Sequence, residues 1–289
     1  FDSAHGHFPG NVSVSGDDIT LGDENIRMFH EREPEKLPWK ELGVDVILEC
    51  TGVFRSKEDA GRHMAAGASK VIISAPSDDA DLTVVMGVNH ETYDPDIHHV
   101  ISNASCTTNS LAPAAKVLND TFGIESLLAT TIHAYTSSQS LVDKAIRKRR
   151  RGRAAAVSLI PTSTGAARAT ELVLPELTGK MDAMAVRAPV LDGAITDIVA
   201  HLTKDVSVET VNAAFKKAAE GELKGVLQYS EDELVSIDII GNPHSSIFDA
   251  PSTMVIGEDR MAKVLVWYDN EYGYAARMLD LASFIMKKA

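Results

Sequence analysis

The sequence has few cysteines, few positive charges and no long apolar run. Two cysteines among 289 residues cannot form a disulfide framework, so a reducing compartment is expected. No hydrophobic stretch reaches the roughly 20 residues that a membrane-spanning helix requires. Only 28 Lys and Arg stand against 41 Asp and Glu, a formal net charge of −13. This balance argues against general binding to nucleic acids or membrane surfaces.

Apolar runs alternate with a helical pattern in the first hundred residues. Residues 44–49 and 71–73 are typical of buried strands, and residues 56–66 between them are typical of a helix. This alternation predicts a Rossmann-like α/β arrangement, a parallel sheet with helices on its faces. Ligands of such sheets bind beyond the carboxyl ends of the strands. Small polar residues follow two of these strands: Thr51, Gly52 and Ser74.

The second half of the chain has longer strands and fewer helices. We expect strands at residues 127–132, 183–187, 194–201, 235–240 and 261–267, and helices at residues 207–219 and 273–286. This pattern predicts an α+β domain with a mostly antiparallel sheet and helices on one face. The boundary between the two patterns lies at Cys106.

Cys106 stands where a strand-like run at residues 99–101 gives way to a helical run at residues 111–118. Ser105 or a neighbouring Thr is suited to cap the first helical turn. The free N–H groups and the helix dipole favour negative charge there, so we expect the thiol to ionise more easily than a free one. A lone cysteine is as often a buried structural residue. The hydroxyl and amide neighbours of this one favour a nucleophile.

The motif Ala-Ser-Cys-Thr-Thr-Asn at residues 104–109, followed by Leu-Ala-Pro, resembles the active-site signature of phosphorylating glyceraldehyde-3-phosphate dehydrogenases. The resemblance covers nearly the whole chain, and it implies a nucleotide-binding domain of residues 1–105 and 271–289 and a catalytic domain of residues 106–270. It implies that Cys106 attacks the aldehyde carbon, that hydride passes to NAD or NADP, and that inorganic phosphate releases the thioester as an acyl phosphate. Thr-Ile-His-Ala-Tyr-Thr resembles the family segment with the catalytic histidine, which implies that His133 is the base.

The resemblance also implies two anion sites and a cofactor site. The inorganic-phosphate site would comprise Ser105, Thr107, Arg151, Thr164 and Gly165. Thr136 and Arg187 would hold the substrate phosphate. The cofactor would contact Arg32, Thr51, Gly52, Ser74, Asn270 and Tyr274. No metal is expected, and the choice between NAD and NADP stays open.

Residues 147–153 contain six positive charges. A nucleic-acid patch is poorly supported in so acidic a protein, and an ordinary solvated loop is the plain alternative. The resemblance implies instead a loop that places Arg151 at the phosphate and lines subunit contacts of a cytoplasmic homotetramer.

The glycine-rich Gly-x-Gly-x-x-Gly turn of dinucleotide-binding sheets is absent. The segment that begins at Phe1 resembles one that, in the family, follows the first strand–helix–strand unit. We therefore expect the nucleotide-binding domain to be incomplete at its N-terminus. Two other functions stay open: a dehydrogenase for erythrose 4-phosphate, and a truncated relative that acts as an interaction protein or a reactive thiol.

Overall fold

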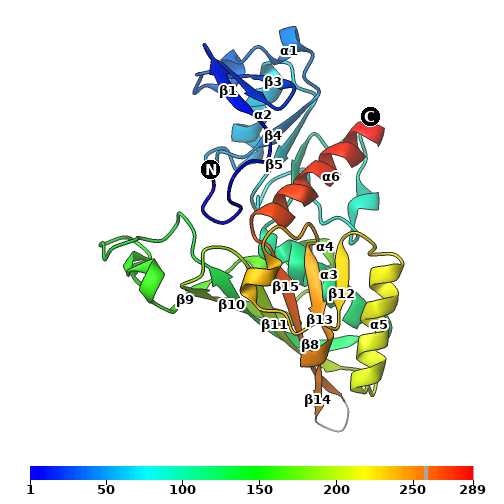
Figure 1. The fold of residues 1–289 in the computed structure, drawn as a ribbon. Helices are drawn as coiled ribbons and strands as arrows, with labels where there is room; N and C mark the ends of the chain where they lie inside the picture. The colour runs from blue at the N-terminus through cyan, green and yellow to red at the C-terminus, as the bar shows by residue number, and fades with distance from the viewer. Residues whose placement is uncertain (257–259, 289) are drawn as a thin grey trace.

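The computed structural model describes residues 1–256 and 260–288, which contain three sheets (Figure 1). The first sheet is small and antiparallel, with strands in the order β1-β2-β3. Its strands are β1 (Val12–Ser15), β2 (Asp18–Leu21) and β3 (Glu24–Arg27). The short helix α1 (Trp39–Leu42) follows it. Because most side chains of β1 and β3 are exposed, this sheet contributes little to the core.

A four-stranded parallel sheet comes next along the chain, as the sequence predicts. Its order is β4-β5-β7-β6, with β4 (Val46–Glu49), β5 (Lys70–Ile73), β7 (Val100–Ser102) and β6 (Leu82–Thr83). Glu49, Ile73 and Ser102 pair in register across three strands. The three strands therefore end at one edge.

Helices cover both faces of the parallel sheet. On one face lies α2 (Lys57–Ala65), whose N-cap Ser56 accepts a hydrogen bond from the Asp59 N–H at 3.1 Å. On the other lies the C-terminal helix α6 (Tyr272–Lys288), drawn in red in Figure 1. Three buried residues of α6 pack against this sheet: Met278, Leu281 and Ile285. The end of the chain thus returns to its first half.

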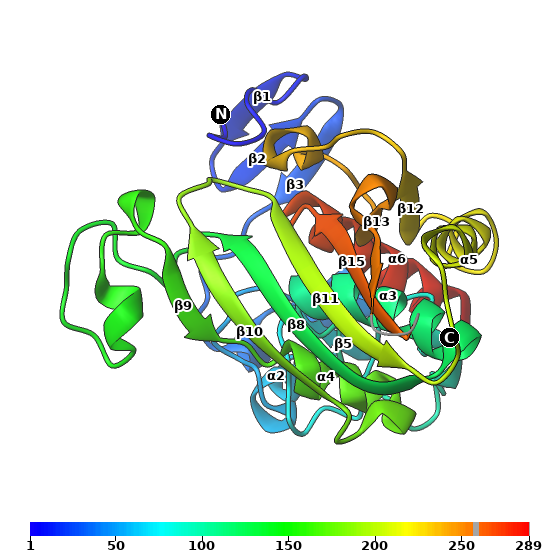
Figure 2. The same cartoon turned by 90° about the horizontal axis from the view of Figure 1, so that it is seen from below.

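The third sheet is larger and mixed, in the order β12-β13-β15-β11-β8-β10-β9, with β14 beside β15. Its strands are β8 (Ile124–Ala134), β9 (Ile160–Ser163), β10 (Met181–Ala188), β11 (Ala194–Leu202), β12 (Leu227–Ser230), β13 (Ser246–Asp249), β14 (Met254–Ile256) and β15 (Met261–Tyr268). The pairs β8–β10 and β12–β13 are parallel, and the other pairs are antiparallel. Seen from below, the sheet lies in front of helices α3 and α4 (Figure 2).

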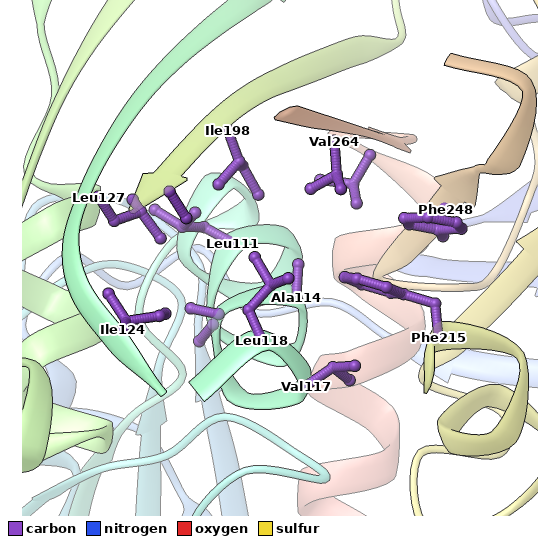
Figure 3. Packing of buried hydrophobic residues seen from close by; sticks show 14 of the residues in the cluster. Leu111, Ala114, Val117, Leu118, Ile124, Leu127, Ile198, Phe215, Phe248 and Val264 are labelled. Carbon is purple, nitrogen blue, oxygen red and sulfur yellow. The ribbon is translucent and has the colours of Figure 1, made fainter. Parts of the chain in front are cut away.

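The main core lies between this sheet and three helices. These are α3 (Cys106–Phe122), α4 (Ala166–Val173) and α5 (Val208–Glu220). Leu111 and Leu118 of α3 are fully buried, and Figure 3 shows them facing the sheet residues Leu127 and Ile198. Burial of one such side chain contributes about 1.5–3 kcal/mol. A pair of stacked rings, Phe215 and Phe248 at 3.9 Å between centroids, attaches α5 to this core.

One predicted strand is wrong. Residues 235–240 form a 3₁₀ turn (Ser236–Ile239) instead. Their apolar residues alternate as in a strand, but Val235 and Ile237 face solvent and only Ile239 is buried. The sequence analysis also missed the short strands β9, β12, β13 and β14. Within the described ranges, no helix combines the length and apolar character needed to cross a bilayer.

Candidate active site

Cys106 is the first residue of α3, and Ser105 is its N-cap. The Ser105 Oγ accepts a hydrogen bond from the Thr108 N–H at 3.1 Å, which satisfies one of the free donors of the first turn. Cys106 is partly exposed. The thiol therefore lies at a capped helix N-terminus, on a residue that is itself partly exposed.

The loop before Cys106 is held in an unusual conformation. Ala104 has a φ of +54° and is the one non-glycine residue with positive φ in the described part of the chain. Its N–H donates to the Ser102 Oγ, and its carbonyl accepts from the Tyr274 hydroxyl, both at 3.1 Å. The Asn109 amide donates to the carbonyls of Asn103 and Ser105. These contacts offset a backbone strain of about 1–2 kcal/mol.

His133 lies beside the sulfur. It is near the end of β8, is 4% exposed, and its Nε2 lies 3.5 Å from the Cys106 Sγ. The parallel register pairs His133 with Arg187 of β10. As a result, an Arg187 Nη1 lies 2.6 Å from the His133 Nδ1 and 2.8 Å from the Ala134 carbonyl. A guanidinium only donates, so a neutral His133 that accepts at Nδ1 carries its proton on Nε2, toward the sulfur.

Burial favours the neutral form of both Cys106 and His133, and the nearby charges add to this effect only at His133. Burial, the Arg187 guanidinium and, more weakly, Arg151 lower the pKa of His133 to about 4. Burial raises the pKa of Cys106, although its neighbours Thr107 and Arg187 act in the opposite direction. The expectation of an easily ionised thiol is therefore wrong for the chain by itself. Desolvation of the sulfur outweighs the helix N–H groups.

Tyr268 is a residue that the sequence analysis missed. Its hydroxyl lies 2.8 Å from both the Thr107 Oγ1 and the Thr131 Oγ1, and its ring packs edge-on against His133 at 5.9 Å. It is fully buried at the end of β15. Every second residue of β15 is buried, which turns Tyr268 toward the core. Tyr268 therefore links α3, which carries Cys106, to β8, which carries His133.

Arg151 lies within the electrostatic range of both His133 and Arg187. Its Nε donates to the Thr162 Oγ1 and its Nη1 to the Ser138 Oγ, each at 3.0 Å. Ser138 in turn lies 2.8 Å from the Thr136 Oγ1. Burial and the charge of Arg151 lower the pKa of Arg187. Two arginines that repel each other beside donor hydroxyls form an environment that favours an anion.

Comparison with known proteins identifies the family. The model described as "Glyceraldehyde 3-phosphate dehydrogenase, C-terminal domain" matches residues 105–270, and the one described as "Glyceraldehyde 3-phosphate dehydrogenase, NAD binding domain" matches residues 1–57. A glyceraldehyde-3-phosphate dehydrogenase of Geobacillus stearothermophilus is 55% identical over 288 residues, all of this chain and 86% of the relative. Glyceraldehyde-3-phosphate dehydrogenase 1 of Bacillus subtilis is 53% identical with the same coverage. The chain belongs to the glyceraldehyde 3-phosphate dehydrogenase family.

The match to the family's NAD binding domain begins at residue 1. The expectation that this domain lacks its N-terminal part is therefore not confirmed.

Four of the predicted cofactor residues of this family member lie at the carboxyl edge of the parallel sheet or beside Cys106. Thr51 and Gly52 follow β4, where both the N–H and the hydroxyl of Thr51 donate to the Glu49 carboxylate. Ser74 follows β5. The Tyr274 ring is close enough to interact electrostatically with both Cys106 and Cys50.

Asn270 and Arg32, the other two predicted cofactor residues, are placed differently from those four. The Asn270 Oδ1 accepts a hydrogen bond from the Gly193 N–H at 3.1 Å, just after β15. Arg32 is exposed on the segment between β3 and α1. No hydrogen bond or ion pair within the described ranges joins Arg32 to the other predicted site residues.

Two of the residues predicted to bind inorganic phosphate, Thr164 and Gly165, lie at the turn between β9 and α4. The Thr164 Oγ1 accepts from the Ala166 N–H at 3.3 Å, and Gly165 is the N-cap of α4. Helix α4 packs against α3, whose first turn carries Ser105 and Thr107. A hollow lies next to this turn, and its lining includes Arg151 and Thr164.

Proposed function

We propose that this chain oxidises glyceraldehyde 3-phosphate to 1,3-bisphosphoglycerate, with inorganic phosphate as the second substrate and NAD or NADP as hydride acceptor. The observation that carries the proposal is a thiol at a helix N-terminus, 3.5 Å from an imidazole nitrogen. A nucleophile beside a base, with cationic groups around them, suits covalent acyl transfer of a phosphorylated substrate. The names of the relatives support this choice of substrate.

Binding of the substrate phosphate would activate the pair. An anion held by Arg187 and Thr136 would neutralise the main charge that now lowers the pKa of His133. It would also draw the Arg187 N–H away from the His133 Nδ1. That nitrogen would then carry a proton and donate it to the Ala134 carbonyl, 2.7 Å away. The Nε2 of His133 would become a base that faces the Cys106 thiol.

The bond changes follow from these positions. Cys106 gives its proton to the His133 Nε2 as its sulfur attacks the aldehyde carbon. The Cys106 N–H and the imidazolium stabilise the resulting oxyanion, which takes a proton from His133 to become the hydroxyl of a thiohemiacetal. Bound at the edge of the parallel sheet, the nicotinamide would supply the acceptor for the hydride of that carbon. His133 removes the hydroxyl proton as the thioester carbonyl forms.

The second phosphate would meet the thioester on the side of α4. We propose that Ser105, Thr107, Arg151, Thr164 and Gly165 hold inorganic phosphate. A phosphate oxygen attacks the thioester carbon, the carbon–sulfur bond breaks, and the Cys106 thiolate leaves with an acyl phosphate as product. Arg151 suits this position because it acts electrostatically on His133 and Arg187 at once.

We propose that residues 1–105 and 271–289 bind the cofactor and that residues 106–270 carry out the chemistry. The in-register ends of β4, β5 and β7 fit a ligand that extends along one sheet edge. The proposed contacts are Arg32, Thr51, Gly52, Ser74, Asn270 and Tyr274. Titration with NAD and with NADP, followed by tryptophan fluorescence, decides which one binds.

We also propose a cytoplasmic homotetramer. The support for assembly is a group of exposed apolar side chains beside the basic run, of which Leu141, Val142 and Val157 are 73–80% exposed. Apolar surface gathered on one segment is typical of subunit contacts. The two unpaired cysteines suit a reducing compartment. Sedimentation of the purified protein tests the number of subunits.

The decisive variant is Cys106→Ser. We expect loss of phosphate-dependent NAD(P)H formation by at least about 10⁴-fold, because the hydroxyl is a far weaker nucleophile than the thiolate. Cys50→Ser is the matched control, since Cys50 is exposed and should retain activity within about twofold. Full turnover by the Cys106→Ser variant would exclude the covalent mechanism.

Two assays separate the alternatives. Comparing rates on glyceraldehyde 3-phosphate and erythrose 4-phosphate identifies the preferred aldehyde. If the protein binds neither NAD nor NADP, the interaction-protein alternative replaces the dehydrogenase.

A further inference from the structure

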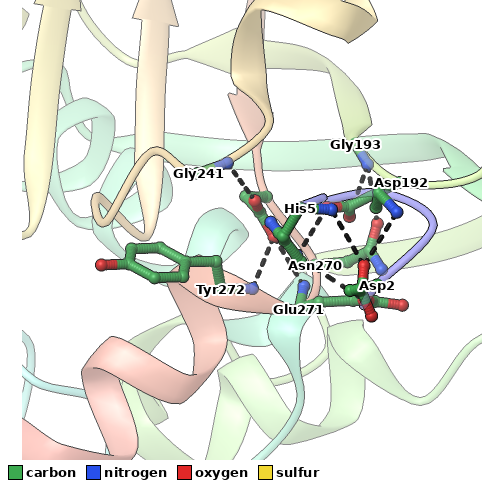
Figure 4. Close-up of polar contacts among 10 residues, drawn as sticks. Asp2, His5, Asp192, Gly193, Gly241, Asn270, Glu271 and Tyr272 are labelled. Atoms are coloured by element: carbon green, nitrogen blue, oxygen red, sulfur yellow. Dashed lines mark hydrogen bonds and ion pairs between the residues drawn. The ribbon is translucent and has the colours of Figure 1, made fainter. Parts of the chain in front are cut away.

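Three segments that are distant in sequence meet near the end of β15. His5 lies in the N-terminal segment, Asp192 in the loop between β10 and β11, and Glu271 just before α6 (Figure 4). The His5 Nε2 is 3.6 Å from the Asp192 Oδ2 and 3.8 Å from the Glu271 Oε2. All three donor atoms lie within 4.8 Å of one another. We propose that these three side chains bind a divalent transition-metal cation of the Zn²⁺ type.

The buried Asp192 carboxylate points to a ligand. Asp192 is 2% exposed, and its Oδ1 accepts from the Gly193 N–H at 2.7 Å. Its Oδ2, which faces His5, has no hydrogen-bond partner in the described part of the chain. A buried carboxylate oxygen without a donor is costly. Burial and the nearby Asp269 accordingly raise the pKa of Asp192 to about 6. A cation bound at the Asp192 Oδ2 would supply the partner that this oxygen lacks.

Asp269 does not compete for the cation. Its Oδ1 accepts from the N–H groups of Glu271 and Tyr272, and its Oδ2 accepts from the Gly241 N–H, all at 2.7–2.8 Å. Both oxygens of Asp269 are therefore already used to shape the turn into α6. The turn that they fix is the one that presents Glu271 to His5.

The donor set suits Zn²⁺. One imidazole nitrogen and two carboxylate oxygens are common zinc ligands, with a water in the fourth position of a tetrahedron. Bonds of about 2.0–2.2 Å place tetrahedral donors about 3.4 Å apart, slightly closer than the observed 3.6 and 3.8 Å. The side chains of His5 and Glu271 are 30% and 54% exposed. They are therefore free to close around the fixed Asp192.

This proposal departs from the sequence prediction, which expected no metal. The residue numbers 5, 192 and 271 give no metal-binding spacing, so only the fold brings the three together. A bound cation would tie the N-terminal segment to the loop that holds Asn270 through Gly193. The competing interpretation is an ion pair in which a protonated His5 bridges two carboxylates and no metal binds.

The experiment measures binding rather than turnover, so it is independent of the proposed activity. Cys106 and His133 would also bind Zn²⁺, because a thiolate is a strong zinc ligand. The titrations therefore use chelator-treated Cys106→Ser protein and ZnCl₂ in a calorimeter. We expect one Zn²⁺ per chain and a rise of the melting temperature with added Zn²⁺.

Two cluster variants and one control complete the test, all in the Cys106→Ser background. Asp192→Asn keeps the side-chain shape and His5→Gln changes an exposed segment, and each should weaken the Zn²⁺ affinity by about tenfold or more. His201→Gln is the control, because His201 lies outside the cluster, where it pairs with Glu125 at 3.0 Å and its side chain is 43% exposed. Its affinity should match that of the parent. Absence of saturable binding, or affinity unchanged in both cluster variants, would overturn the proposal.

Discussion

Two buried histidines in this molecule face opposite charges. His133 in the mixed sheet has Arg187 at 2.6 Å and the Cys106 sulfur at 3.5 Å. His63 on α2 lies 3.0 Å from the Glu49 Oε2 and accepts from the Trp39 indole N–H at 3.0 Å. The two are 4% and 6% exposed, so burial does not distinguish them. Their neighbours distinguish them. A carboxylate and an indole hold the His63 ring, whereas cations favour the neutral form of His133 beside a thiol.

The surroundings of His63 indicate a structural role. Glu49 is buried, which disfavours its charge, yet hydrogen bonds from His63 and Thr51 lower its pKa below the ordinary value. The Glu49–His63 pair thereby holds the end of β4, next to Thr51, a proposed cofactor contact. A buried histidine close to polar residues is therefore not by itself a catalytic candidate. A cationic neighbour and a nucleophile are the distinguishing features.

Of the changes that test this comparison of the two histidines, His133→Asn should have the largest effect. We expect kcat/KM to fall by roughly 10²–10⁴-fold, because the variant loses the group that accepts the thiol proton. Steady-state rates on glyceraldehyde 3-phosphate, together with alkylation rates of Cys106, measure the loss. Rates within a few-fold of the parent protein would mean that His133 is not the base.

The next effect concerns pH and stability. Since the pKa of His133 is about 4 when folded and 6.5 when unfolded, the unfolded chain binds its proton first as the pH falls. The stabilisation by neutral His133 is complete above pH 6.5 and is lost on acidification from pH 6.5 to 4, by about 3 kcal/mol. Because Asp192, whose pKa is raised to about 6, contributes in the opposite sense below that pH, the loss is measured as a difference. Denaturant unfolding at several pH values should show the parent protein and His63→Gln losing about 3 kcal/mol relative to His133→Asn between pH 6.5 and 4. An equal loss in His133→Asn would contradict the assignment.

A smaller effect is expected for His63→Gln. The Trp39 indole and the Glu49 carboxylate would each lose a partner, which should lower the free energy of unfolding by about 1–3 kcal/mol. At saturating cofactor, kcat should remain within about threefold of the parent value. Chemical denaturation and initial rates on the same preparation give both numbers. A large fall in kcat with unchanged stability would remove the contrast between the two histidines.

Sequence reasoning works best where one short motif fixes both the local structure and the chemistry. The residues before and after Cys106 predict the strand, the Ser105 cap and the helix correctly. The alternation in the first hundred residues predicts the parallel sheet. Residues 235–240 fail because apolar alternation alone does not say whether a partner strand is present to bury them.

The electrostatics of the site lies beyond local patterns. The sequence places Cys106 at a helix N-terminus but does not give the desolvation that raises the pKa of its thiol. Nor does it show Tyr268 between two threonine hydroxyls, because Thr107, Thr131 and Tyr268 are separated by up to 161 positions. Long-range pairing by the sheets decides these contacts.

The left-handed backbone of Ala104 affects how accurately the Cys106 sulfur is positioned. Glycine at this position would relieve a strain of about 1–2 kcal/mol, but it would also free the peptide to rotate. As alanine, the residue has few backbone conformations to choose from, and β7, α3 and α6 each contribute a hydrogen bond around it. Misplacement of a reacting atom by 1 Å lowers rates by about 10²-fold. The loop is therefore less stable than one with glycine at this position, but it restricts the direction in which the Cys106 sulfur can face a substrate carbon.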